Sequence, residues 1–358
     1  MQIERKYALG FDTEWDIAAV RTALCDARHI VLVAHTHADG DAVGSLTGMY
    51  QLCLRLDGAA GRTVTAMLPD GVPDDLLWLP CTDKVLHGKA DAARCREAIV
   101  EADLIVGLDI SGLGRTDTLE EALRASTARK ILVDHHINPE REAFDTVVSE
   151  HEASSTCELV YWLMRETFGK ELFTKDAATS LYTGICTDTG TFSFSNDRAS
   201  VYLAAAELLE YGIDPKGINL SIKNVFTVPR MRFYGHALSE CLTVYEKQKV
   251  ALMTLSADEM RRYGVTSAEL TGLINEVMKL KDVDCGVLVR EDTDDELEGV
   301  QRERRVRLSL RSKEIYDVNL LAGEMFGGGG HMRAAGATST ASLEETVEIV
   351  KRKLQLSK

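Results

Sequence analysis

The chain has 358 residues, enough for two domains that each bury their own hydrophobic core. It contains 41 Lys and Arg residues and 56 Asp and Glu residues, which gives a formal net charge of −15. This balance argues against a protein that binds long duplex nucleic acid through a broad basic surface. A short anionic substrate held by metal ions and a few arginines remains compatible with it.

The N-terminus shows no signal-peptide pattern, and no apolar run approaches the ~18 residues that a membrane span requires. The eight cysteines form no Cys-x-x-Cys pair, and several lie in apolar patterns, as is typical of reduced thiols. We therefore expect a cytoplasmic protein without a membrane partner.

In the first part of the chain, short apolar runs alternate with amphipathic stretches. We expect helices at 12–27, 42–56, 91–101 and 118–125, and strands at 30–33, 64–68, 104–109 and 131–134. This alternation predicts a mainly parallel sheet flanked by helices. The carboxyl ends of parallel strands share one edge, so residues that follow different strands can meet there.

Histidines and aspartates follow several of these apolar runs. The first strand leads into His35-Thr-His-Ala-Asp39-Gly-Asp41, the third ends at Asp109, and the fourth leads into 134–136, Asp-His-His. A further carboxylate, Asp188, follows the apolar helix expected at 177–186. Carboxylate and imidazole ligands suit Mn²⁺ or Mg²⁺ better than a soft metal.

Between these motifs and the second domain, Ser155 to Glu158 predict a capping box that opens a helix to about residue 168. The cap explains Ser154, Ser155 and Thr156, although a role in phosphate contact stays open. A helix is also expected at 198–211, followed by a connector at 214–238.

The last third of the chain predicts a second α/β unit. We expect strands at 249–254 and 283–289, a helix at 267–280 between them, and an acidic solvated loop at 291–298. Residues 305–311 alternate, which places Arg305, Arg307 and Arg311 on one face of a strand. That face is either solvated or a phosphate contact. Four glycines, 327–330, then precede His331 within folded sequence and could let backbone amides approach a phosphate.

Together these motifs resemble the DHH-family phosphoesterases that carry the DHH-associated C-terminal domain. The resemblance covers about residues 29–337 and, at this length, is greatest to the stand-alone oligoribonuclease (nanoRNase) and pAp phosphatase type, where pAp is 3′-phosphoadenosine 5′-phosphate. It implies an α/β catalytic domain at 1–213, a helical connector at 214–238 and a smaller mixed-sheet domain at 239–358. The active site is expected in the cleft between the domains.

The resemblance also assigns roles. One metal would be held by His35, Asp39 and Asp109, and the other by Asp41, Asp109, His135 and Asp188. His136 would face the substrate, and Asp134 would fix an imidazole. Substrate would contact Arg115, Arg311, Gly328, Gly329, Gly330 and His331.

The implied cofactors are two divalent ions, Mn²⁺ first and Mg²⁺ or Co²⁺ as alternatives. The implied reaction is hydrolysis of short RNA to mononucleotides and of pAp to AMP. Cleavage of cyclic or linear dinucleotides, hydrolysis of pyrophosphate or polyphosphate, and non-enzymatic RNA binding are the alternatives. The sequence does not decide the order of preference among these substrates, the polarity of cleavage or whether the protein forms a homodimer. It also does not decide whether His37 is a metal ligand or a polar loop residue.

Overall fold

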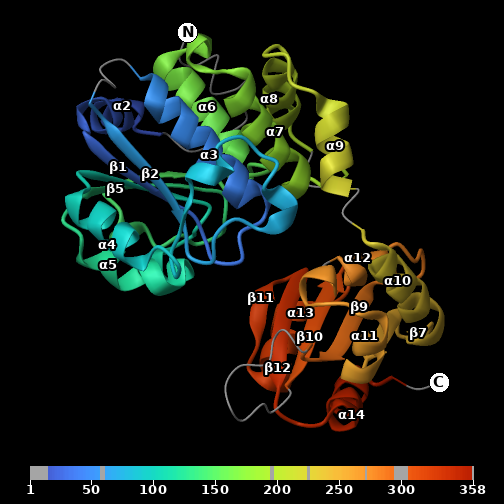
Figure 1. Ribbon diagram of the computed structural model, residues 1–358. Coiled ribbons are helices and arrows are strands. Elements are labelled where there is room, and N and C mark those ends of the chain that lie inside the picture. Colours follow the sequence, from blue (N-terminus) through green and yellow to red (C-terminus); the bar gives the residue numbers. More distant parts are fainter. Residues whose placement is uncertain are drawn as a thin grey trace. The chain divides into compact units, whose positions relative to one another are not determined.

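The computed structural model describes residues 15–56, 61–193, 197–223, 226–270, 272–293 and 305–356. The chain divides into two compact units, Met1–Val225 and Phe226–Lys358, and both combine helices with a sheet (Figure 1). The division falls inside the stretch 214–238. Helix α9 (Pro215–Lys223) packs Ile218 into the core of the first unit, whereas α10 (Val228–Glu240) packs Phe233 into the second.

The first unit contains a six-stranded sheet in the order β3-β2-β1-β4-β5-β6, and all of its strand pairs are parallel. The strands are β1 (His29–Val33), β2 (Thr63–Leu68), β3 (Leu86–His87), β4 (Leu104–Leu108), β5 (Arg129–Asp134) and β6 (Thr146–Ser149). This confirms the parallel sheet predicted from the sequence. The strand order reverses between β1 and β4, and such a switch point is where open α/β sheets bind ligands.

Helices cover both faces of this sheet (Figure 1). They are α2 (Ile17–Asp26), α3 (Gly40–Arg55), α4 (Ala92–Glu101), α5 (Glu120–Ala125), α6 (Thr156–Phe168), α7 (Lys175–Asp188) and α8 (Ala199–Leu209), besides α9. Because side chains alternate along a strand, Ile30 and Leu32 pack in the core beneath α3 and α6. Val31 and Val33 pack in the opposite core, beneath α4 and α5.

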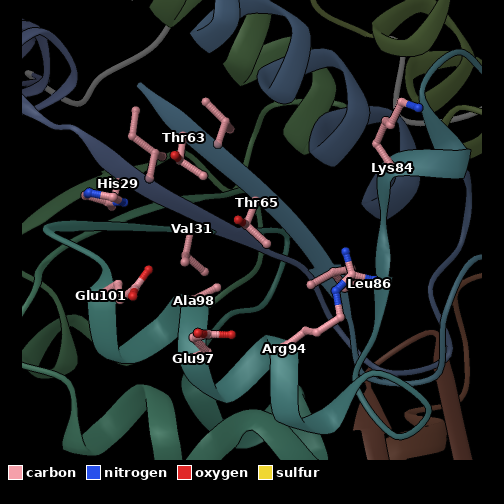
Figure 2. A pocket seen from close by; sticks show the side chains of 12 residues that line it. His29, Val31, Thr63, Thr65, Lys84, Leu86, Arg94, Glu97, Ala98 and Glu101 are labelled. Carbon is pink, nitrogen blue, oxygen red and sulfur yellow. The ribbon is translucent and has the colours of Figure 1, made fainter. Parts of the chain in front are cut away.

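A hollow of about 250 Å³ lies beside α4 (Figure 2). It is lined by the first residues of β1 and β2, His29 and Thr63, and by charged side chains that include Lys84, Arg94 and Glu97. The connection between β2 and β3 contains only short 3-10 turns, so it provides no α-helix to cover this part of the sheet. Because the first residues of β1 and β2 line it, the hollow is near the amino ends of the strands and not at the carboxyl edge where the motifs lie.

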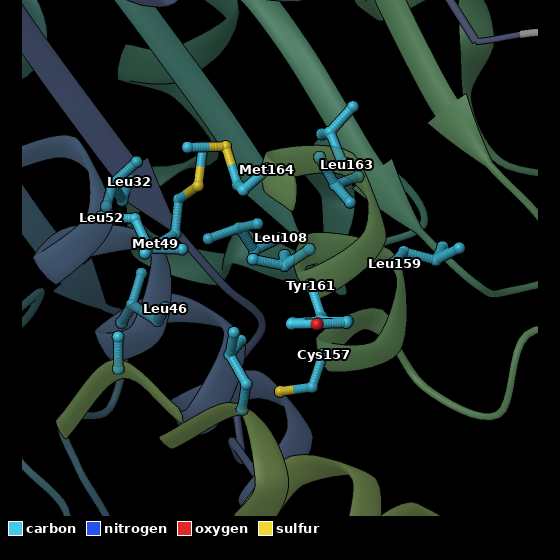
Figure 3. Close-up of a cluster of buried hydrophobic side chains, with 14 of the residues drawn as sticks. Leu32, Leu46, Met49, Leu52, Leu108, Cys157, Leu159, Tyr161, Leu163 and Met164 are labelled. Atoms are coloured by element: carbon cyan, nitrogen blue, oxygen red, sulfur yellow. The ribbon is translucent and has the colours of Figure 1, made fainter. Parts of the chain in front are cut away.

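The opposite core holds the elements that carry the motifs. Buried side chains of α3 and α6, among them Met49 and Tyr161, pack over the sheet (Figure 3). Helix α3 approaches α7 closely through Gly40, Gly44 and Gly48, since an added Cβ at Gly44 would lie 2.5 Å from the carbonyl oxygen of Ser180. This packing fixes the N-terminus of α3 next to the C-terminus of α7.

The second unit has a mixed six-stranded sheet in the order β11-β12-β10-β9-β8-β7, in which only β8 and β9 pair in parallel. Its strands are β7 (Leu242–Tyr245), β8 (Val250–Leu255), β9 (Cys285–Glu291), β10 (Val306–Ser312), β11 (Gly329–His331) and β12 (Ala334–Ser339). Its helices, besides α10, are α11 (Ala257–Tyr263), α12 (Leu273–Val277), α13 (Val318–Phe326) and α14 (Leu343–Lys353). The predicted mixed sheet is thus confirmed.

Some sequence predictions need correction. The helix expected at 267–280 is a 3-10 turn (Ala268–Leu270) followed by the short α12, because Gly272 adopts a left-handed conformation at φ 87°. Of the acidic loop at 291–298, residues 294–298 lie outside the described part of the chain. Across the described residues, no helix is long and apolar enough to cross a membrane.

Candidate active site

The predicted metal ligands come together at the carboxyl edge of the parallel sheet. His35 follows β1, Asp109 follows β4, His135 follows β5, and Asp188 is the last residue of α7. The Nε2 atom of His35 lies 3.3 Å from Oδ2 of Asp109. The Nε2 atom of His135 lies 3.2 Å from Oδ2 of Asp188 and 3.5 Å from Oδ1 of Asp109.

Three overlapping groups of ligand atoms result from this convergence. They are His35, Asp39 and Asp109; Asp41, His135 and Asp188; and Asp109, His135 and His136. The first group contains the three residues predicted for one metal, and the second contains the residues predicted for the other except Asp109. The third group adds His136, to which the sequence assigned only a catalytic role. His37 lies outside these groups, and its largely exposed ring is 3.3 Å from Asp70.

The N-terminus of α6 holds the buried carboxylate of Asp41. The backbone amides of Thr156 and Cys157 donate hydrogen bonds of 2.7 and 2.8 Å to its two oxygens. The hydroxyl of Thr156 also donates to Oδ1 of Asp109, at 3.0 Å. A helix N-terminus favours negative charge, so α6 stabilises this fully buried carboxylate.

The carboxylates at this edge of the sheet change one another's pKa values. Burial and the nearby charge of Asp109 raise the pKa of Asp41 to about 7. Burial and the charge of Asp41 raise the pKa of Asp188 well above its usual value. For Asp109, burial disfavours the charged form, but the hydrogen bond from His35 and the proximity of His135 hold its pKa below the usual range.

This donor set fits a divalent cation. His35 Nδ1 lies 2.7 Å from the carbonyl oxygen of Thr36, so this nitrogen carries a hydrogen and Nε2 faces Asp109. The contact between His35 and Asp109 then needs a second proton on the ring, and a cation between the two groups would replace that proton. A cation would also relieve the repulsion between Asp41 and Asp188. This site therefore has the oxygen and imidazole ligands that a divalent metal ion requires.

A second chain of contacts joins Asp134, His136 and Arg115. The buried Asp134 carboxylate accepts hydrogen bonds from the amides of Ser111 and His136 and lies 2.9 Å from His136 Nδ1. On the other side of the ring, Nε2 lies 3.0 Å from Nη1 of Arg115. Because arginine only donates, Nε2 must accept there and the ring proton is on Nδ1. The imidazole is thus held in one orientation and one tautomer.

Two contributors to the site were not assigned from the sequence. Thr156 was interpreted as part of a helix cap, yet Ser155 is the cap and Thr156 contacts two of the carboxylates. The capping box is also incomplete, since the Glu158 carboxylate accepts from the amide of Ser154.

Asp70 follows β2 and accepts hydrogen bonds from the Thr36 hydroxyl and the His37 amide. The rule that carboxylates follow strand ends would have found Asp70.

The substrate residues predicted in the second unit lie on β10 and β11. Arg311 is half-buried, its Nη1 donates to the carbonyl of Leu310, and no described carboxylate forms an ion pair with it. The amides of Gly328 and Gly330 donate to Ala322 and Asn319 within the protein. These two amides are therefore already occupied, so the contact of the glycine run with a phosphate remains a prediction. The side chain of His331 is outside the described part of the structure.

Comparison with known proteins identifies both domains of this chain. Residues 29–185 match the model of the DHH family N-terminal domain, and residues 247–356 match the DHHA1 domain. A relative from Thermus thermophilus, named bifunctional oligoribonuclease and PAP phosphatase NrnA, is 30% identical over 86% of this chain and 83% of its own. The chain belongs to the DHH family. It is a phosphoesterase, and hence a hydrolase.

Other proteins are similar to this chain over most of its length. The protein of the same name from Bacillus subtilis is 27% identical over 86% of this chain and 88% of its own. The crystal structure of an exopolyphosphatase-related protein from Bacteroides fragilis is 32% identical, covers 95% of both chains and superimposes with a TM-score of 0.87. Both domains of the DHH phosphoesterase are therefore shared with these proteins.

The Thr156 hydroxyl gives a first testable prediction. We expect Thr156→Val to lower hydrolysis of a generic phosphodiester by about tenfold or more, since a hydrogen bond to a charged group contributes about 1.5–3 kcal/mol. Thr179→Val is the matched control, because among the described residues the Thr179 hydroxyl bonds only the Lys175 carbonyl of its own helix. Initial rates at saturating Mn²⁺ would test this prediction, and an equal effect of both changes would contradict it.

Proposed function

We propose that this protein hydrolyses short RNA oligonucleotides to mononucleotides and removes the 3′-phosphate of pAp. One observation carries the proposal: six predicted ligands and the oriented His136 converge at the switch point of the parallel sheet. The relatives whose names include oligoribonuclease and PAP phosphatase match over most of the chain and support the substrate class.

In this proposal, His35, Asp39 and Asp109 hold one divalent ion, and Asp41, His135 and Asp188 hold the other with Asp109 between them. Two such ions, with Mn²⁺ preferred over Mg²⁺ or Co²⁺, would supply a bound water of lowered pKa and positive charge near the reacting phosphate. The Asp109 carboxylate can serve both groups because Oδ2 faces His35 and Oδ1 faces His135.

His136 and Arg115 act on the substrate side. Arg115 donates to a phosphate oxygen, for which its guanidinium is suited, and in doing so it leaves Nε2 of His136. That nitrogen is then available to hold a proton for the leaving oxygen. Burial disfavours the charged ring, but the hydrogen bond to Asp134 and the charge of Asp109 outweigh this effect and raise the pKa of His136. Asp134 thus positions the ring and stabilises its protonated form.

Arg311 gives a prediction about nucleotide recognition. We expect Arg311→Ala to weaken kcat/KM for pAp and RNA dinucleotides by about 10-fold to 100-fold, the effect of losing ~1.5–3 kcal/mol from a charge-assisted hydrogen bond. Hydrolysis of bis-p-nitrophenyl phosphate should change little, because it needs only the residues of the first unit.

Arg307→Ala is the matched control for Arg311→Ala. Arg307 lies on the same face of β10, but its Nε donates to the buried carboxylate of Asp292 at 2.7 Å. Its charge is therefore already paired, and nucleotide hydrolysis should persist in that variant. A parallel loss of activity on nucleotides and on the small ester in Arg311→Ala would show that this arginine supports the fold and does not recognise the nucleotide.

A substrate panel tests the proposed function directly. Purified protein with Mn²⁺, Mg²⁺ or EDTA is assayed on pAp, RNA dinucleotides, much longer RNA, linear and cyclic dinucleotides, and pyrophosphate. We expect hydrolysis of pAp and of the shortest RNA, with rates that fall as length increases and vanish in EDTA. A preference for cyclic dinucleotides or pyrophosphate would overturn the proposal, and so would activity that survives EDTA.

A further inference from the structure

A second group of metal-ligating side chains lies in the second unit, where α10, β7 and α11 meet (Figure 1). His236 is on α10, Cys241 caps the C-terminus of that helix, and Glu259 is on α11. Their ligand atoms form a triangle with sides of 3.3 Å (Nε2 to Oε1), 3.5 Å (Nε2 to Sγ) and 3.4 Å (Oε1 to Sγ). The hydrolytic mechanism uses none of these residues.

The structure holds the ring and the carboxylate in place. The His236 ring stacks on Tyr263, with ring centres 5.2 Å apart and planes inclined by 26°. One carboxylate oxygen of Glu259, Oε2, accepts from the amide and hydroxyl of Ser256 in a capping box. The other oxygen, Oε1, is left facing His236 and Cys241. Both ligands are thus oriented before any ion binds, which lowers the entropic cost of binding.

The dimensions of the triangle match tetrahedral coordination. Zinc bonds of about 2.0–2.3 Å to N, O and S at tetrahedral angles place neighbouring ligand atoms roughly 3.3–3.6 Å apart. All three observed separations are close to this range. A hydrogen bond between imidazolium and carboxylate is usually shorter, about 2.7–2.9 Å. The nitrogen-to-oxygen separation is longer than that, whereas the two contacts of Sγ have a length that is also usual for thiol hydrogen bonds. The three distances together accommodate a shared ion.

We propose that His236, Cys241 and Glu259 bind a zinc ion that joins α10 to α11. Nitrogen, sulfur and oxygen ligands in this geometry favour zinc over the harder Mn²⁺ or Mg²⁺. Three protein ligands leave a fourth position for water, and an ion can reach it because the side chains of His236 and Glu259 are 18% and 36% exposed. Binding releases the thiol proton of Cys241 to solvent. This proposal is independent of the proposed function.

Cobalt provides a readout that does not depend on hydrolysis. Full-length protein, reduced and stripped of metal, is titrated with Co²⁺, and thiolate-to-cobalt charge transfer is followed in the near ultraviolet. The carboxylate and imidazole groups of the candidate active site have no thiol among their ligands, so cobalt bound there does not give this band. The candidate active site takes up as many as two cobalt ions without giving the band. We therefore expect the band to reach its maximum within three equivalents of Co²⁺ and an excess of Zn²⁺ to abolish it.

Variants identify the thiol and the imidazole. Cys241→Ser should lose the band, whereas Cys25→Ser, a change of an exposed thiol in the first unit, should retain it. His236→Asn keeps the thiol and should weaken cobalt binding at least tenfold, so it tests the site even where Cys241→Ser fails to fold. Absence of the band in the unmodified protein would overturn the proposal. So would a band that persists in Cys241→Ser, or unchanged cobalt affinity in His236→Asn.

Discussion

Replacing Asp109 by asparagine is expected to lower phosphoester hydrolysis by about three orders of magnitude or more, a loss of ~4 kcal/mol in transition-state stabilisation. The carboxylate lies between His35 and His135 and accepts from Thr156, so both groups of ligands lose negative charge together. Asparagine is preferable to alanine in this test. Asp109 has φ 60°, a conformation that asparagine tolerates and alanine resists.

The measurement is kcat/KM for pAp and for a generic ester at several Mn²⁺ concentrations, together with metal content after dialysis. Asp75→Asn, the same change at an exposed position, should leave both unchanged. We also expect Asp109→Asn to unfold cooperatively like the unmodified protein. Near-normal hydrolysis in Asp109→Asn would remove the two-metal proposal.

The sequence predicted the arrangement of the first unit because two simple regularities act together. Apolar runs of strand length alternate with helices, which requires a parallel sheet, and in such a sheet the residues after the strands share an edge. Asp109 and the Asp-His-His motif could therefore be placed together without any structure. The site roles that family resemblance assigns to them remain proposals, although the distances are compatible with them.

Other features depend on backbone conformation and close packing, which sequence patterns do not express. The residues around Asp109 and Ser111 do not predict the left-handed φ angles of 60° and 54° that these two residues adopt. Such strained backbone conformations persist only where the surrounding structure enforces them. The amides of α6 that hold Asp41 were equally hidden, because a helix cap has the same sequence signature whether or not a distant carboxylate binds to it.

The glycine run shows how one pattern can serve two purposes. From the sequence, glycines 327–330 indicated a close approach of backbone to phosphate. In the structure, a Cβ at Gly328 would lie 2.2 Å from the carbonyl oxygen of Gly336. Gly330 has φ 151°, and a Cβ there would lie 2.5 Å from the carbonyl oxygen of Ala334 in β12. These glycines are thus required by the packing of β11 on β12, and any contact with substrate is additional to that requirement.

Glycine packing also leads to a prediction about stability. An added Cβ at Gly184 in α7 would lie 2.2 Å from Sγ of Cys157 and 2.8 Å from Oδ1 of Asp41. Both neighbours are fully buried, so neither can move into solvent. We expect Gly184→Ala to lower the free energy of unfolding by about 1–3 kcal/mol, the usual cost of overpacking a core. It should also displace Asp41 and so reduce hydrolysis and metal affinity.

The same substitution at Gly235 should act in the opposite direction. Gly235 lies within α10 in a helical conformation, and an added Cβ there meets no atom within 4 Å. Gly235→Ala is expected to raise the free energy of unfolding by about 0.5–1 kcal/mol, because alanine loses less backbone entropy than glycine in a helix. Urea unfolding of both variants, followed by the hydrolytic assay, separates the two effects. Gly184→Ala with unchanged stability and unchanged hydrolysis would show that the contact between α7 and Asp41 does not position the site.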